Sequence, residues 1–124
     1  MEKIDELSIS RVSEEMYRIA FDHGFHDGDG QPGLSKHVTV ERMSKYCANL
    51  HGEVSELWEA VRHGKLDAPC DKEGCNLTCG EEELADIVIR AMDCAEDLGV
   101  DLGRAIKLKS EYNRSRPYMH GKLA

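Results

Sequence analysis

The chain has 124 residues and a formal net charge of −8, so we expect a single domain, residues 1–124, with one core. The acidic balance disfavours a general surface for nucleic-acid polymers or anionic membranes, because such surfaces need clustered Lys and Arg. With a charged N-terminal segment, MEKIDELSIS, and no run of eighteen apolar residues, we expect a soluble, cytoplasmic protein with reduced cysteines.

Apolar residues at three- and four-residue spacing predict helices along most of the chain. A first helix is expected from Ser10 to Asp22, and the glycine-rich segment HGFHDGDGQPG that follows is expected to be a solvated loop. A second helix is expected from an N-cap at Thr39 to His63. Its apolar stripe comprises Met43, Cys47, Leu50, Val54, Leu57 and Val61.

Two further helices are expected in the second half of the chain. The third runs from Glu81 to Leu98, with Thr78 and Glu81 placed to form a capping box. The fourth runs from Leu102 to Arg114, with Asp101 as its cap. The third helix has a stripe of Leu84, Ile87, Val88, Ala91, Ala95 and Leu98. Because period-2 alternation is almost absent, the predicted class is all-α.

Two carboxylate pairs border these stripes at i, i+3 spacing, Glu53 with Glu56 and Glu83 with Asp86. Antiparallel packing of the two helices would bring all four acids together. Such an oxygen-rich set suits Mg²⁺ or Mn²⁺ better than zinc. The alternative is that both pairs are solvated helix faces. Other acids are interpreted as surface charges, with Glu59 and Glu82 as reserve ligands: Glu59, Glu81, Glu82 and Asp93.

The C-terminal segment KSEYNRSRPYMHGKLA is locally basic, in contrast to the rest of the chain. Its cations are Lys109, Arg114, Arg116, His120 and Lys122, with Tyr112 and Tyr118 between them. These charges complement the acids and suit a phosphate ligand. The tyrosines can either stack on a base or pack against the helix.

The remaining signals are weaker. Cys70, Cys75 and Cys79 follow His63, but without the C-x2-C spacing of strong zinc signatures they are interpreted as loop thiols. Cys47 and Cys94 are interpreted as core residues. Trp58 is interpreted as part of a helix-packing edge or subunit interface, with base stacking as the alternative. Ile89, off the main stripe, indicates a second buried face, and hence an oligomer.

The order ExxE, loop, ExxD and then K-x-x-x-N-x-x-RP-Y-x-HGK, over Tyr46 to Lys122, resembles the MazG-type all-α nucleoside triphosphate pyrophosphohydrolases. The resemblance implies a four- to five-helix bundle, dimeric or tetrameric, that releases a monophosphate and pyrophosphate. It implies Mg²⁺ ligands at Glu53, Glu56, Glu83 and Asp86, and substrate contacts at Lys109, Asn113, Arg116, Tyr118 and Lys122. Many members have EExxE, whereas Gly52 occupies the first position here.

For this chemistry a carboxylate not fully committed to metal is expected to accept the proton of the attacking water, and Glu53 and Glu56 are the two candidates. Phosphoribosyl-ATP pyrophosphohydrolase is a related activity without separate support. A ferritin-like di-iron bundle would need ExxH motifs, which neither acid pair provides. The non-enzymatic alternative is a helical interaction module with a basic tail.

Overall fold

The computed structural model describes residues 3–27 and 40–121. Within these ranges the chain forms four α-helices and one short 3-10 helix, with no strand. They are α1 (Glu6–Asp22), α2 (Val40–Arg62), α3 (Cys79–Asp97), α4 (Leu102–Ser115) and η2 (Tyr118–Gly121). The all-α prediction is confirmed. The predicted cap Thr39 and the predicted substrate contact Lys122 lie outside the described residues.

Side-chain caps fix where three of the helices begin. Thr78 and Glu81 form the predicted capping box of α3, each side chain accepting a hydrogen bond from the other's backbone N–H. Asp101 caps α4, also as predicted. The first helix begins at Glu6, earlier than predicted, because Asp5 caps it.

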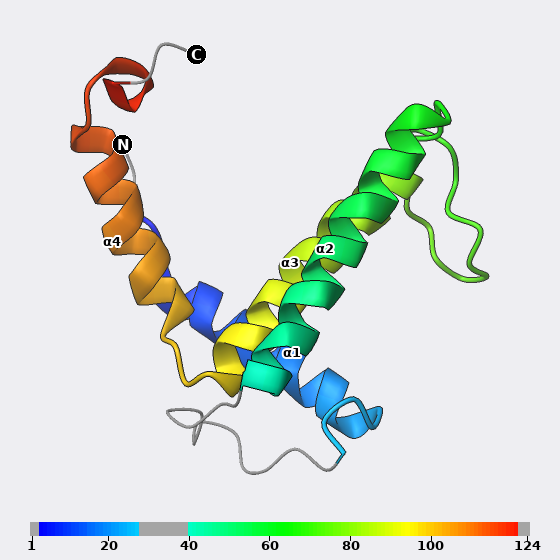
Figure 1. Ribbon diagram of the computed structural model, residues 1–124, viewed down its shortest axis with the longest axis horizontal. Coiled ribbons are helices and arrows are strands. Elements are labelled where there is room, and N and C mark those ends of the chain that lie inside the picture. Colours follow the sequence, from blue (N-terminus) through cyan, green and yellow to red (C-terminus); the bar gives the residue numbers. More distant parts are fainter. Residues whose placement is uncertain (1–2, 28–39, 122–124) are drawn as a thin grey trace.

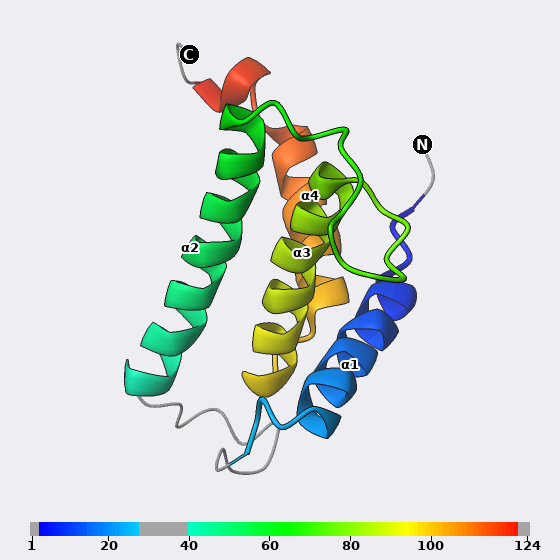
Figure 2. The same cartoon turned by 90° about the vertical axis from the view of Figure 1, so that its right-hand side faces the viewer.

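The helices form a V rather than a closed bundle in this single chain (Figure 1). Helices α2 and α3 lie side by side and antiparallel, and α1 crosses α3 (Figure 2). Helix α4 packs against α1 and forms the other arm. Gly103 allows this packing, since a Cβ at that position would overlap the carbonyl oxygen of Glu6.

The core of the described chain is small. Its buried apolar residues are Tyr17, Tyr46, Cys94 and Ala95. Several predicted stripe residues are instead exposed, among them Val54 at 51%, Leu84 at 55% and Val88 at 50%. Cys47, predicted to be a core residue, is exposed as well. The stripe residues stay exposed within one chain because α4 lies on the other arm and does not cover the α2–α3 pair, whereas the prediction of a core Cys47 was wrong.

No helix in the described ranges is both long enough and apolar enough to span a membrane.

Candidate metal centre

Antiparallel packing of α2 and α3 brings three of the four predicted ligands together. Carboxylate oxygens of Glu53, Glu56 and Glu83 lie within 4.8 Å of one another. Across the described ranges this is the one set of three or more acidic, His or Cys side chains that meets the geometry of a metal site. Asp86, the fourth predicted ligand, is not part of this set, but it lines a groove together with Glu53. We call these four residues the acidic cluster.

Two oxygens of the acidic cluster are buried without a hydrogen-bond donor from the described residues. One is Oε2 of Glu53 and the other is Oε2 of Glu83. The second oxygen of Glu53 accepts a hydrogen bond of 3.1 Å from Nε of Arg90. Leaving a buried carboxylate oxygen unsatisfied is costly, so a cation or a proton is expected there. The donor set, which contains only oxygens, fits Mg²⁺ or Mn²⁺.

The charges of the acidic cluster are only partly balanced. Burial raises the pKa of the Glu83 carboxyl, the neighbouring Glu56 raises it further, and the Lys72 ammonium opposes this. Burial likewise raises the pKa of Asp86, to which the negative charge of Glu53 adds. Raised carboxyl pKa values indicate that the anionic form is disfavoured until positive charge arrives.

The two predicted reserve ligands do not complete the cluster. Glu59 is exposed and pairs with Arg62 at 3.0 Å and with His63 at 3.2 Å. Glu82 is buried rather than a surface charge, and its carboxylate pairs with Lys72. A Cβ added at Gly52 would meet no atom within 4 Å, so a larger side chain would have room at this position.

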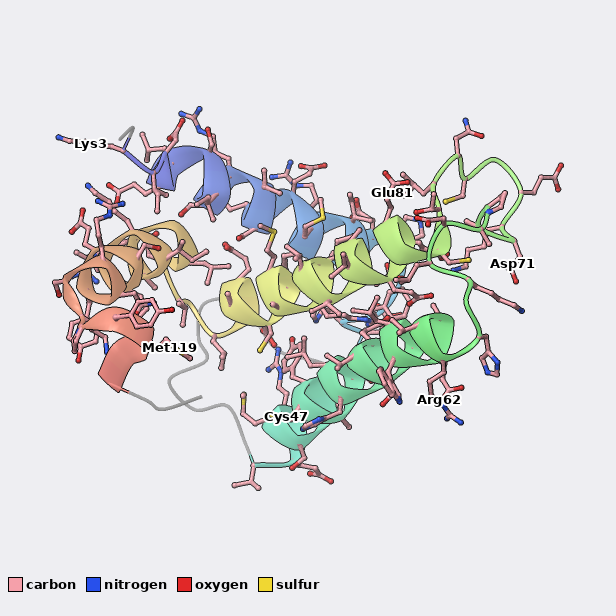
Figure 3. All side chains as sticks on the ribbon, turned by 90° about the horizontal axis from the view of Figure 1, so that it is seen from above. Lys3, Cys47, Arg62, Asp71, Glu81 and Met119 are labelled. Atoms are coloured by element: carbon pink, nitrogen blue, oxygen red, sulfur yellow. The ribbon has the colours of Figure 1, made fainter. Side chains whose placement is uncertain are left out.

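The basic tail lies away from the acidic cluster within one chain. Lys109 and Asn113 belong to α4, Arg116 follows it, and Tyr118 lies in η2, so all four occupy the other arm of the V (Figure 1). In Figure 3, Met119 of the tail lies far from Glu81 at the start of α3. The predicted phosphate contacts and the predicted metal ligands are therefore not brought together.

Within the tail, Tyr112 is a platform for cations. The ammonium of Lys109 lies 4.7 Å from its ring centroid, and the guanidinium of Arg116 lies 5.6 Å from it. Tyr118 is 91% exposed. The Oδ1 atom of Asn113 is buried and has no hydrogen-bond partner in the described part of the chain.

The cysteine segment shows no zinc geometry. Cys70, Cys75 and Cys79 lie in or at the end of the loop between α2 and α3, and they are free thiols. His63 is turned toward Glu59, and the three cysteines of the described ranges are not grouped as metal ligands. The acidic cluster also lacks a histidine, so a ferritin-like di-iron site has no support.

A groove of about 500 Å³ opens beside the acidic cluster, between α1 and α3. Glu53, Asp86 and Arg90 form part of its wall, and its apolar wall is made by Met16, Ile19, Ala20, Phe25 and Ile89. Phe25 is 58% exposed, and the Arg90 guanidinium lies 5.7 Å from its ring centroid. A groove of this size and mixed character suits a small organic ligand. Sequence reasoning missed it because the groove depends on how α1 packs against α3, which periodicity does not reveal.

The opposite end of the α2–α3 pair holds a buried ionic network that the sequence did not indicate. Asp97 is fully buried, and it accepts hydrogen bonds from Arg42, at 2.5 Å, and from the hydroxyl of Tyr46. Nε2 of His26 lies 2.6 Å from Oδ1 of Asp93. The predictions of a surface Asp93 and a solvated His26 were wrong, because their partners lie more than sixty residues apart in sequence.

Comparison of the chain with known protein families, with curated proteins and with solved structures finds no significant match.

Proposed function

We propose that this protein is a Mg²⁺-dependent nucleoside triphosphate pyrophosphohydrolase, cleaving between the α and β phosphates to give a monophosphate and pyrophosphate. The observation that carries the proposal is the convergence of three carboxylates, two of which keep a buried oxygen without a donor. When bound, Mg²⁺ neutralises phosphate oxygens and polarises the phosphorus centre.

The residues divide into ligands and a base by their surroundings. Glu53 and Glu83 supply the buried oxygens that face the metal position, with Asp86 beside them. Glu53 is also held by Arg90, whereas Glu56 is exposed and open to water. We therefore propose that Glu56 accepts a proton from a water whose oxygen bonds to the α phosphorus, while the bond from that phosphorus to the pyrophosphate oxygen breaks.

The groove between α1 and α3 supports a nucleoside as the organic part of the substrate. Phe25 is exposed over more than half of its surface, and the Arg90 guanidinium lies over its ring. A flat base can stack on such a ring, since aromatic stacking does not depend on a particular hydrogen-bond pattern. The groove reaches Glu53 and Asp86, so a bound nucleoside would direct its phosphates toward the acidic cluster.

The proposal includes a second copy of the chain. Exposed apolar side chains on α2 and α3, Val54, Trp58, Leu84 and Val88, leave a face that a helical partner would cover. The basic tail has the charge that the acidic cluster lacks, but it lies on the other arm. A homodimer or homotetramer in which the tail of one copy approaches the acids of another satisfies both observations.

Enzymatic activity is tested with a panel of nucleoside triphosphates and Mg²⁺, measuring pyrophosphate and monophosphate separately from orthophosphate. Glu56→Gln and Asp86→Asn are each expected to lower kcat by about a hundredfold or more. The first removes the general base, and the second removes a negative charge beside the metal ligands. Glu59→Gln is the matched control, because Glu59 lies one turn along the same helix and pairs only at the surface. A wild-type protein that releases no pyrophosphate from any member of the panel contradicts the proposal and favours the interaction module.

The second copy is tested by light scattering and by subunit mixing. Glu56→Gln and Arg116→Ala are each expected to be inactive alone, and their mixture is expected to regain activity through sites that combine an intact acid set with an intact tail. A monomer that is fully active in solution contradicts this part of the proposal.

A further inference from the structure

Backbone hydrogen bonds join the two ends of the loop between α2 and α3. Cys70 N–H donates to the Leu77 carbonyl at 2.8 Å, and Pro69 and Thr78 form an antiparallel bridge. Inside this closed loop, Cys75 N–H donates to the Lys72 carbonyl at 3.1 Å. The backbone N–H of Lys72 in turn points to Sγ of Cys70 at 3.4 Å. The backbone of Lys72 is therefore held from both sides.

The fastened loop lies against the start of α3. Figure 3 shows Asp71, the neighbour of Lys72, on the same side of the molecule as Glu81. The Lys72 ammonium pairs with the carboxylate of Glu82, whose side chain is only 11% exposed. Glu82 precedes the metal-side residue Glu83 in the first turn of α3. A cation is thus anchored at the edge of the acidic cluster.

Lys72 keeps most of its surface in water despite this anchor, with 63% of its side chain exposed. An ammonium has three N–H donors, and the carboxylate of Glu82 is the acceptor that the structure gives it. The positive charge of Lys72 also acts on Glu83 and Asp86, where it opposes the burial that raises the pKa of both carboxyls. Glu82 itself is stabilised by the helix N-terminus whether or not Lys72 shares its charge.

We infer that Lys72 is a phosphate-binding residue of the acidic cluster, contacting a non-bridging oxygen of the β or γ phosphate while Glu82 orients its ammonium. This inference rests on the proposed function, since it needs a phosphate ligand at the metal-loaded cluster. It supplies within one chain a cation that the basic tail does not bring to the site. With metal bound at the acidic cluster, the negative charges that Lys72 faces would be those of its partner Glu82 and of the bound phosphates.

Calorimetric titration of inorganic pyrophosphate into the full-length protein with Mg²⁺ tests the assignment without relying on turnover. Lys72→Met is expected to weaken binding about tenfold or more, the loss of one charge-assisted hydrogen bond. Lys72→Arg is expected to keep most of the affinity. Glu82→Gln is expected to weaken binding less than Lys72→Met, because the ammonium remains but loses its anchor.

Lys65→Met is the matched control, since it removes the same charge from an exposed residue of the same loop, and it is expected to bind like the wild type. Equal affinity of Lys72→Met and wild type overturns the inference while the proposed function stands. A wild-type protein that binds neither pyrophosphate nor nucleotide with Mg²⁺ overturns both. A loss in Lys65→Met equal to that in Lys72→Met also overturns the inference, because it would show a general effect of net charge.

Discussion

At one end of the α2–α3 pair, Asp93 and Asp97 each have a hydrogen-bond donor, whereas at the other end Glu53 and Glu83 keep buried oxygens without one. Both ends belong to the same pair of helices, with Asp93, Asp97 and Glu83 on α3 and Glu53 on α2. A buried acid whose hydrogen bonds are satisfied stabilises the packing of the helices. A buried acid with an unsatisfied oxygen can bind a cation instead. The difference separates a structural set from a candidate functional set without reference to any relative.

The largest effect is expected from breaking the satisfied end. Asp97→Ala leaves Arg42 and Tyr46 facing a buried position without their acceptor, so the free energy of unfolding is expected to fall by about 3–5 kcal/mol. Urea denaturation measures this, and Mg²⁺ should not restore it. Asp67→Ala, at an exposed loop aspartate, is the control. A loss from Asp97→Ala no larger than that of the control would remove the distinction between the two ends.

A smaller effect is expected from titrating the unsatisfied end. Burial raises the pKa of Glu83 and Asp86 above the ordinary range near 4. At pH values between the ordinary carboxyl pKa near 4 and the raised folded-state pKa, the folded protein therefore binds more protons than the unfolded chain. Stability in EDTA is therefore expected to increase as the pH falls from 7 toward 5, and to be lost again as the pH rises.

Asp93 and Glu96, whose pKa values burial also raises, act in the same direction. Melting curves in EDTA at pH 5 and pH 7 measure the combined effect. Mg²⁺ is expected to reduce the difference between the two melting temperatures, because it replaces the missing positive charge. Glu83→Gln is expected to reduce the same difference without metal. Melting temperatures in EDTA that rise from pH 5 to pH 7 would contradict this account of the acidic cluster.

The smallest effect is expected at Gly52, one residue before the acidic cluster on α2. Alanine there meets no neighbouring atom within 4 Å, so Gly52→Ala is expected to raise the free energy of unfolding by about 0.5–1 kcal/mol through helix propensity. Metal affinity should not change. A loss of metal affinity in this variant would mean that Gly52 is needed for close approach to the site.

The sequence predicts the local features of this protein well and its long-range partners poorly. The capping box of Thr78 and Glu81 was predictable because both residues lie within one turn. The convergence of Glu53, Glu56 and Glu83 was predictable because antiparallel helices carry matching i, i+3 pairs. In contrast, the burial of Asp93 depends on His26, which the pattern of α3 alone cannot reveal.

The apolar stripes were predictable, but the elements that cover them were not. Periodicity identifies the apolar side of a helix but not the element that covers it. Val54 and Val88 lie on predicted stripes and are half exposed, because α4 packs on α1 instead of on the α2–α3 pair. The position of α4 depends in part on the close contact between Gly103 and Glu6. The apolar periodicity of a helix does not predict such a contact.

Direct titration of Mn²⁺, followed by electron paramagnetic resonance of the free ion and repeated in competition with Mg²⁺, tests the central claim that the acidic cluster is a divalent-metal site. The wild-type protein is expected to bind Mn²⁺, Glu53→Gln and Glu83→Gln are expected to lose most of that binding, and Glu59→Gln is expected to retain it. Equal Mn²⁺ binding by wild type and Glu83→Gln, or no binding by the wild type, would contradict the claim.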